Sequence, residues 1–263
     1  GRLQARIAGL PQSGALTDRL YRGDLFAQLR YSGAAEALWR LAGIELLDVT
    51  GPATVAADVR GTLGNPQVQG SFAGDALRVR SGLIGTDITG VTARGRFNGS
   101  RFNLSSFSGT APNGGSVSGS GFVDLSGITA QRGPRMDIRI AARDAEILDL
   151  ANMGATVTGP LRIISDGTGG TIAARLRAND ARWRLGRVAE ALAQLPSVPT
   201  REINIPADVA PVALITAPWR YLIDVSAPGG IEVDGMGLES EWRTDNLQIR
   251  GTTDDPRLGG SVA

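Results

Sequence analysis

Apolar and polar residues alternate with a period of two along most of this chain. In six runs every second residue is apolar or small and most of those between are polar: 55–61, 91–97, 117–125, 136–140, 172–178 and 219–225. Successive side chains of a β-strand point to opposite faces, so each run predicts a strand with one apolar face and one wet face. This alternation is typical of an antiparallel sheet rather than a parallel sheet covered on both sides. Turn signals such as Asn98-Gly99 and Pro228-Gly229 predict hairpins between neighbouring strands.

Two stretches break the period and predict short helices. Residues 33–43 (GAAEALWRLAG) are rich in Ala and Leu, and residues 187–195 (RVAEALAQL) carry apolar residues three and four positions apart. We expect both to lie against the sheet or to close one of its ends. A membrane-surface helix is the competing interpretation, but each stretch is too short and too weakly charged to favour it.

One fifteen-residue phrase occurs twice. VRGTLGNPQVQGSFA (59–73) returns as IRGTTDDPRLGGSVA (249–263), 190 positions further on (249 − 59 = 190). Proline cannot donate to a strand ladder and fixes φ for a turn, so each copy predicts a strand, a corner and a returning strand. Glycines and alanines on the apolar face are expected to leave space, which favours bending of the sheet or close approach of another group.

The residues that are missing exclude several kinds of chemistry. The chain has no Cys and no His, and all of its basic residues are Arg. Without His or Lys there is no Ser-His pair, no His metal ligand, no P-loop lysine and no Schiff base. We therefore expect no enzyme, no catalytic residues, no metal site and no cofactor. The net charge of +1 predicts no nucleic-acid partner.

The repeated phrase, Gly-Thr-x-x-x-Pro-x-[Leu/Val]-x-Gly-Ser, carries a family resemblance. Together with YSGAAEALWRLAG upstream of a strand that begins at Gly51-Pro52, it resembles the TamB branch of the AsmA-like envelope proteins of Gram-negative bacteria. GLESEWRTDNLQIRGTTDDPRLGGSVA is similar to that family's repeat unit. The resemblance implies an all-β fold, in which a long, curved, mainly antiparallel sheet forms a U-shaped β-groove (β-taco). Residues 1–263 would be one groove domain or a fragment of a longer groove.

The resemblance also implies a place and a function. Such proteins lie in the periplasm, anchored to the inner membrane by a segment not present in this sequence. They are implicated in phospholipid transport to the outer membrane. They are also implicated, with the outer-membrane barrel partner TamA, in the assembly of β-barrel and autotransporter proteins. The expected partners are therefore a phospholipid or other acyl-chain ligand and a TamA-like barrel. The alternation then predicts these groove-lining residues: Val55, Val59, Val91, Phe97, Phe102, Leu104, Val117, Val123, Leu125, Met136, Ile138, Ile140, Ile172, Leu176, Trp219, Tyr221, Ile223, Leu247 and Ile249.

Alternation by itself leaves other architectures and functions open. A filled β-sandwich would show the same pattern, with the apolar faces packed against each other. An assembly scaffold would use edge strands, with residues 247–251 and 257–263 as candidates, to pair with a client strand. An extracellular passenger repeat is a third possibility.

Overall fold

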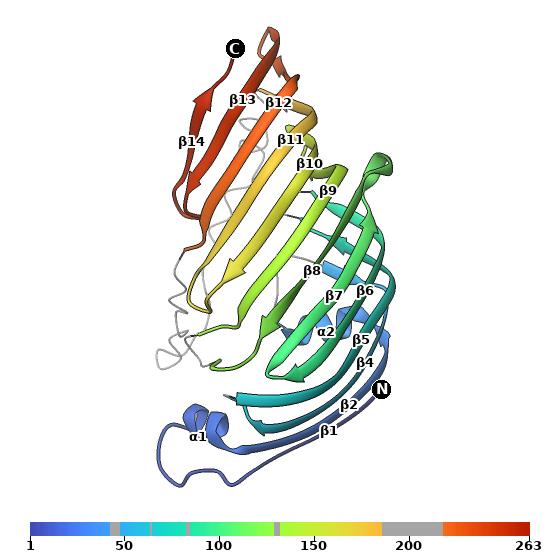
Figure 1. Ribbon diagram of the computed structural model, residues 1–263, viewed down its shortest axis with the longest axis vertical. Coiled ribbons are helices and arrows are strands. Elements are labelled where there is room, and N and C mark those ends of the chain that lie inside the picture. Colours follow the sequence, from blue (N-terminus) through green and yellow to red (C-terminus); the bar gives the residue numbers. More distant parts are fainter. Residues whose placement is uncertain (43–47, 64, 83–84, 129–131, 186–217) are drawn as a thin grey trace, which may run out of the picture.

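One large β-sheet makes up most of the protein. The computed structural model describes residues 1–263 except 43–47, 64, 83–84, 129–131 and 186–217 (Figure 1). The described residues form a sheet of 14 strands in the order β1-β2-β4-β5-β6-β7-β8-β9-β10-β11-β12-β13-β14, and β3 pairs with β5 off this path. The strands are β1 (Arg2–Ala8), β2 (Asp24–Ala34), β3 (Asp48–Thr50), β4 (Pro52–Thr62), β5 (Asn65–Arg80), β6 (Asp87–Gly99), β7 (Arg101–Thr110), β8 (Ser116–Asp124), β9 (Arg135–Asp149), β10 (Met153–Ser165), β11 (Gly170–Arg184), β12 (Arg220–Gly235), β13 (Leu238–Gly251) and β14 (Pro256–Ser261).

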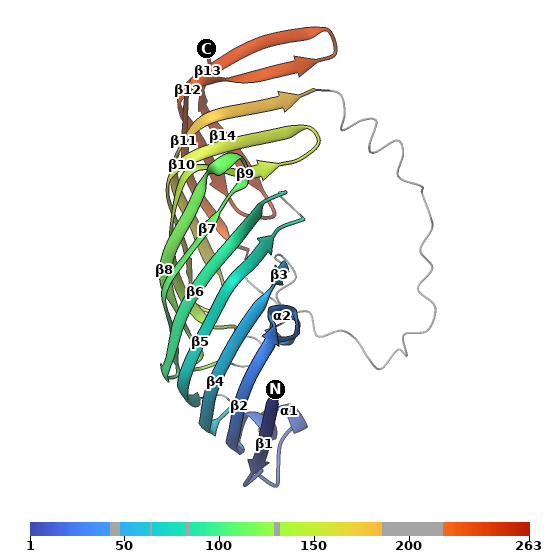
Figure 2. The same cartoon turned by 90° about the vertical axis from the view of Figure 1, so that its right-hand side faces the viewer.

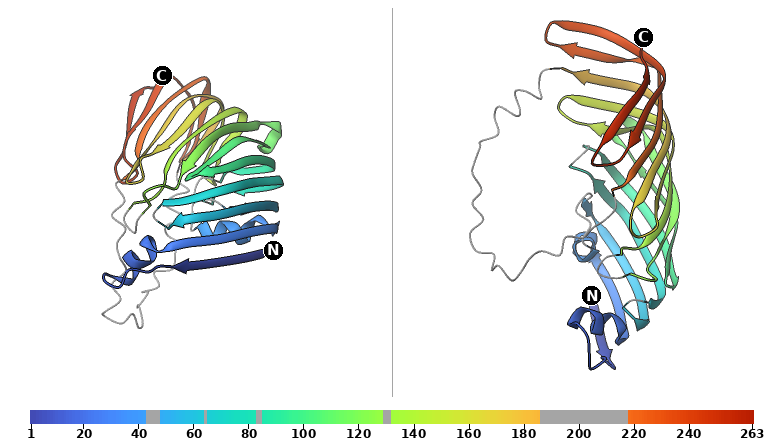
Figure 3. Two further views of the ribbon diagram at one scale, coloured as in Figure 1. Left: turned by 60° about the horizontal axis from the view of Figure 1, so that its bottom comes forward. Right: turned by 90° about the vertical axis from the view of Figure 1, so that its left-hand side faces the viewer.

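The predicted open, curved sheet is confirmed, and the filled sandwich is wrong for the described part of the chain. The described strands belong to one open sheet, whose outermost strands are β1 and β14. Neighbouring strands along the path pair antiparallel, except that β11 and β12 run parallel. Figures 2 and 3 show the sheet as an arch with a concave and a convex side.

Two α-helices lie among the described residues. Helix α2 (Ala35–Ala42) confirms the helix predicted over 33–43. It lies on the concave side of the sheet, where Leu38 packs against the buried clusters of the apolar face (Figure 2). Helix α1 (Leu16–Arg22) was not predicted, because it is only seven residues long and no side chain caps its start. The helix predicted over 187–195 lies outside the described residues.

The first copy of the repeated phrase forms the predicted hairpin between β4 and β5. Gly61 lies opposite Pro66, and the Thr62 hydroxyl accepts a hydrogen bond from the Asn65 amide at 3.1 Å. Gly61 has φ +94°, a left-handed value that a residue with a side chain rarely adopts. The pairing of β4 with β5 continues to the corner, where Thr62 lies opposite Asn65.

The second copy builds the same corner between β13 and β14. Gly251 lies opposite Pro256, and the Thr252 hydroxyl accepts a hydrogen bond from the Asp255 amide at 3.2 Å. Gly251 has φ +83°. The two sequence copies therefore specify the same register and the same turn contacts.

One rim of the sheet folds inward. Register shifts and a positive φ at Ala76 bend β5, and bulges of this kind increase local twist and curvature. The turn between β5 and β6 consequently reaches β9, passing over the shorter β7–β8 hairpin and its 3-10 turn η1 (Pro112–Gly114). The Thr86 hydroxyl donates a hydrogen bond to the Ile147 carbonyl at 2.5 Å. We call this end of the strands the folded rim.

The buried core consists mainly of small residues. Of the 19 buried hydrophobic residues described, ten are alanine. The main cluster runs from Leu77 and Ile88 through Val117 and Val157 to Leu176. Buried area, and with it hydrophobic stabilisation, is therefore concentrated near the folded rim.

Candidate functional site

Strand register gathers the predicted groove-lining residues on one face of the sheet. A row of directly opposed residues crosses five strands from β8 to β12, and we call it the isoleucine row: Gly121, Ile138, Ile163, Ile172 and Tyr221. Directly paired residues point to the same side of a sheet, so this row is continuous on the concave side. Ile163 belongs to it but was missed in the sequence, because β10 reads Leu161-Arg162-Ile163-Ile164 and does not alternate cleanly.

The remaining predicted positions extend the same face. Phe97 lies opposite Phe102, which lies opposite Val123, and Val123 lies opposite Met136. Trp219 precedes β12, and its ring lies against Gly170. Leu125 follows β8, where its amide donates to the Ser100 carbonyl. The other predicted positions lie within strands of the same face: Val55, Val59, Val91, Leu104, Val117, Ile140, Leu176, Ile223, Leu247 and Ile249.

Exposure changes along the strands of this face. Near the folded rim, Val117 and Val157 are buried. Toward the opposite rim, Val123, Ile138 and Ile163 are each partly exposed. Across β8–β10, one end of the apolar face is therefore filled by the protein's own side chains, and the other presents large aliphatic side chains to the surroundings, whereas on β5 the buried Val68 lies toward the opposite rim. Apolar surface left open in this way marks interaction sites.

Small residues on this face leave less space than the sequence suggests. The Phe107 ring occupies the place of a Cβ on Gly119, and the Trp219 ring does the same at Gly170. The expectation that glycines and alanines leave gaps is wrong at these positions, because side chains from neighbouring strands cover them. Ala57, Ala93 and Ala174 are themselves buried.

Arginine–carboxylate pairs cover the opposite, convex face. Arg162 binds Asp137 through two nitrogens, at 2.8 and 2.7 Å, and this hydrogen bonding lowers the pKa of Asp137. Arg30 pairs with Asp58 across β2 and β4. Exposed ion pairs of this kind contribute little to the free energy of unfolding. They keep the convex face hydrated, which disfavours its association with apolar surfaces.

Asp124, at the end of β8, is the most enclosed of these carboxylates. It is 5% exposed and accepts hydrogen bonds from the Ser126 amide at 2.9 Å, the Ser100 hydroxyl at 3.0 Å and Arg135 at 2.8 Å. Burial raises the pKa of Asp124, but the hydrogen bonds from Ser126 and Ser100 and the charge of Arg135 outweigh it and lower the pKa to about 2. The ionised Asp124 carboxylate, next to Val123, therefore stabilises the connection between β8 and β9 through these hydrogen bonds and its ion pair with Arg135.

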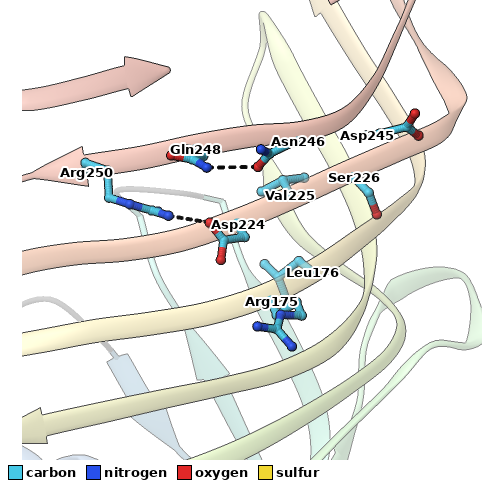
Figure 4. A pocket seen from close by; sticks show the side chains of 9 residues that line it. All are labelled: Arg175, Leu176, Asp224, Val225, Ser226, Asp245, Asn246, Gln248 and Arg250. Atoms are coloured by element: carbon cyan, nitrogen blue, oxygen red, sulfur yellow. Dashed lines mark hydrogen bonds and ion pairs between the residues drawn. The ribbon is translucent and has the colours of Figure 1, made fainter. Parts of the chain in front are cut away.

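Two depressions of the surface are open and have mixed polar and apolar linings. One has a volume of about 350 Å³ and is lined mostly by polar side chains of β11–β13, including Asp224 and Arg250, which form an ion pair (Figure 4). The other, about 360 Å³, is lined partly by Asn103, Ser120 and Arg139. Neither has the enclosed apolar walls of a small-molecule pocket, so the extended apolar face is the better candidate site.

No group of His, Cys, Asp or Glu in the described part of the chain could hold a metal ion. Among the residues described, no helix has both the length and the apolar character needed to cross a bilayer.

An open, curved sheet with one apolar concave face and one charged convex face defines a groove-type β-protein. Residues 105–263, more than half of the chain, match the family described as the TamB C-terminal domain. The chain belongs to the TamB family, whose members form an envelope translocation and assembly module. Comparisons with curated proteins and with solved structures gave no match.

Proposed function

We propose that the open part of the apolar face shelters phospholipid acyl chains on their way between the inner and outer membranes. The observation that supports this most is the exposure gradient, because the large aliphatic side chains of the isoleucine row are only partly covered. Such a face stabilises hydrocarbon without specific polar contacts. The proposal includes a periplasmic location and an anchor in the inner membrane.

The energetics and dimensions suit an acyl chain. Each CH₂ group sheltered from water contributes about 0.8 kcal/mol, so a chain of about sixteen carbons gains on the order of 12 kcal/mol when fully covered. Strands lie about 4.8 Å apart, so the five strands of the isoleucine row span about 19 Å. That is comparable with half the thickness of a bilayer's hydrocarbon core, about 15 Å.

Site-specific photocrosslinking tests the proposal. A photoreactive residue at Ile138 faces the open part of the groove, whereas the adjacent Arg139 faces the convex side and serves as the matched control. Lipid adducts, identified by mass spectrometry, are expected at Ile138 and not at Arg139. A probe at the buried Val157 is expected to react with protein. Equal lipid labelling at Ile138 and Arg139, or none at either, would contradict the proposal.

A blocking variant separates transport from folding. Val123→Arg places a charge on the partly exposed half of the face and is expected to reduce lipid adducts at Ile138 while the protein stays folded. Ser120→Arg, on the convex face of the same strand, is the control. Loss of folding in Val123→Arg alone would favour a packed core at this position.

A second candidate function is a scaffold that pairs with strands of outer-membrane proteins, together with a TamA-like barrel. The outermost strands of the described sheet, β1 and β14, favour it, because a strand at a sheet edge can present backbone hydrogen-bonding groups to another strand.

A further inference from the structure

The isoleucine row continues beyond β8 on the same face of the sheet. From Gly121, directly opposed residues lead through β7, β6 and β5 to β4: Leu104, Gly95, Phe72 and Val55. The exposure of this continuous apolar path changes along its length. Ile138 is partly exposed, whereas Val55 is only 7% exposed. Ala57 and Val68, which lie nearer the opposite rim on β4 and β5, are also buried. The path is therefore open over β8–β12 and covered over β4 and β5.

Helix α2 lies over the covered end of the path, on the concave side of the sheet (Figure 2). Ala35 is buried in the main cluster, and Leu38, one turn further along α2, packs against the cluster that contains Val55. Residues three apart share one face of a helix, so these two side chains face the sheet together, while Ala37 is exposed. The helix thus covers apolar surface of the kind that we propose an acyl chain covers at β8–β12.

Helix α2 and β3 form an excursion between two strands that pair directly with each other. Ala34 lies opposite Pro52 in the β2–β4 ladder, and the Ala35 amide donates to the Gly51 carbonyl at 2.7 Å, which closes the base of the excursion. Strand β3 is paired with β5 through only three residues, 48–50. Movement of α2 away from the concave face therefore breaks no pair of the β2–β4 ladder.

The docked helix carries a carboxylate oxygen without a hydrogen-bond donor. The Glu36 Oε2 atom is buried, and no donor among the described residues is within hydrogen-bonding distance of it. Burying a polar atom without a hydrogen bond costs free energy, and more so when the group is charged. The position of Glu36 in the first turn of α2 offsets part of this cost, because a helix N-terminus favours negative charge. Undocking returns this oxygen to water.

We propose that α2 is a displaceable stopper of the groove. It competes with an acyl chain for the concave face over β4 and β5, and its undocking extends the sheltering surface from β8–β12 to β4. Leu38 favours the docked state by its apolar contacts, and Glu36 opposes it by its buried carboxylate. This inference rests on the proposed lipid function and adds a means of regulating it, because the length of groove open to lipid depends on the position of α2.

Two photoreactive probes test the stopper. An alkyl diazirine side chain at Val55 reports on the covered end of the path, and one at Ile138 reports on the open part. The 263-residue chain is mixed with vesicles of phosphatidylethanolamine and phosphatidylglycerol, and adducts are identified by mass spectrometry. In the parent chain the probe at Val55 is expected to crosslink to α2, whereas the probe at Ile138 is expected to crosslink to lipid.

Leu38→Ser is expected to release the stopper. Loss of a partly buried leucine shifts the docking equilibrium about 5-fold toward the undocked state, so lipid adducts at Val55 rise several-fold. Ala37→Ser is the matched control: it lowers helix propensity at least as much, but residue 37 faces away from the sheet, so labelling at Val55 is expected to stay unchanged. Lipid labelling at Ile138 in the same samples shows that the sheet remains folded.

Glu36→Met is expected to act in the opposite direction. It removes the buried charge, so lipid adducts at Val55 fall and hydrogen exchange of the α2 amides slows, whereas mere damage to the helix would speed that exchange. The stopper is refuted if Val55 and Ile138 label equally in the parent, if Leu38→Ser gives lipid at Ile138 but no gain at Val55, or if Glu36→Met speeds exchange in α2. Absence of lipid at Ile138 in every variant would instead refute the proposed function, and the stopper with it.

Discussion

The Phe102 ring of β7 lies across Gly95 of β6, in the space that a side chain on residue 95 would fill. Phe102 also contacts Phe97, with ring centroids 4.6 Å apart, and Phe72, with centroids 6.2 Å apart in an edge-to-face arrangement. Glycine and phenylalanine are thus complementary across the β6–β7 pair. The large Phe102 side chain fills the space that Gly95, which has no side chain, would otherwise leave open on this face of the sheet.

This complementarity predicts a coupled pair of substitutions. Gly95→Ala alone is expected to cost about 1–3 kcal/mol of unfolding free energy, because the new methyl group displaces the ring. In a Phe102→Ala background the same change should cost much less. Chemical denaturation of the single and double variants measures the coupling. Additive effects would show that the ring does not restrict residue 95.

The second copy of the repeated corner predicts which substitutions destabilise the β13–β14 hairpin. Gly251→Ala is expected to destabilise by more than 1 kcal/mol, because its φ of +83° disfavours a side chain. Gly259→Ala is the control, since nothing lies within 4 Å of its Cβ position and φ is not left-handed. Thr252→Ala should cost about 1 kcal/mol by removing the acceptor for the Asp255 amide. Hydrogen exchange of that amide reports the loss directly, and unchanged exchange would contradict it.

Asp124 predicts a pH dependence of stability. Its folded pKa of about 2 lies below its ordinary value of 3.8, so the folded state favours the ionised carboxylate. The resulting stabilisation, about 2 kcal/mol, is complete above about pH 5 and disappears as the pH falls from about 4 to 2. Asp124→Asn should lose most of this dependence, whereas Asp254→Asn, in an exposed turn, should retain it. Urea unfolding at a series of pH values makes the comparison, and identical pH profiles for Asp124→Asn and the parent would refute the role.

The folded rim predicts a local effect. Thr86→Val removes the hydroxyl that donates to the Ile147 carbonyl but keeps the shape of the side chain. A loss of about 1 kcal/mol is expected, with faster hydrogen exchange in the turn between β5 and β6. Thr89→Val is the control, because the hydroxyl of Thr89 makes only a 3.4 Å contact with the Thr110 carbonyl. Equal effects of the two changes would indicate that the rim does not depend on this bond.

The sequence was sufficient for the sheet, the hairpins and the apolar face, since these follow from local rules. Alternation determines the face of each residue, and Gly-Thr-x-x-x-Pro determines the corner. It was insufficient where distant strands decide the outcome. The covering of Gly119 by Phe107 depends on register between strands, and the burial of Val157 depends on the fold of a rim formed by residues some sixty positions apart (147 − 86 = 61). Ile163 was missed because its neighbour Ile164 is also apolar, so this part of β10 does not alternate cleanly.

The parallel pairing of β11 and β12 determines which side of the molecule the second corner occupies. In a sheet of consecutive antiparallel strands, successive turns alternate between the two rims of the sheet. Whether two given turns lie at the same rim therefore depends on how many strands separate them. Because β12 runs parallel to β11, the alternation shifts by one strand. The corner at Gly251 therefore lies at the same rim of the sheet as the corner at Gly61. A duplicated hairpin inserted after an ordinary reversal would instead face the other way. Among the described strands, the parallel step from β11 to β12 thus lets two distant copies of one motif point in a common direction.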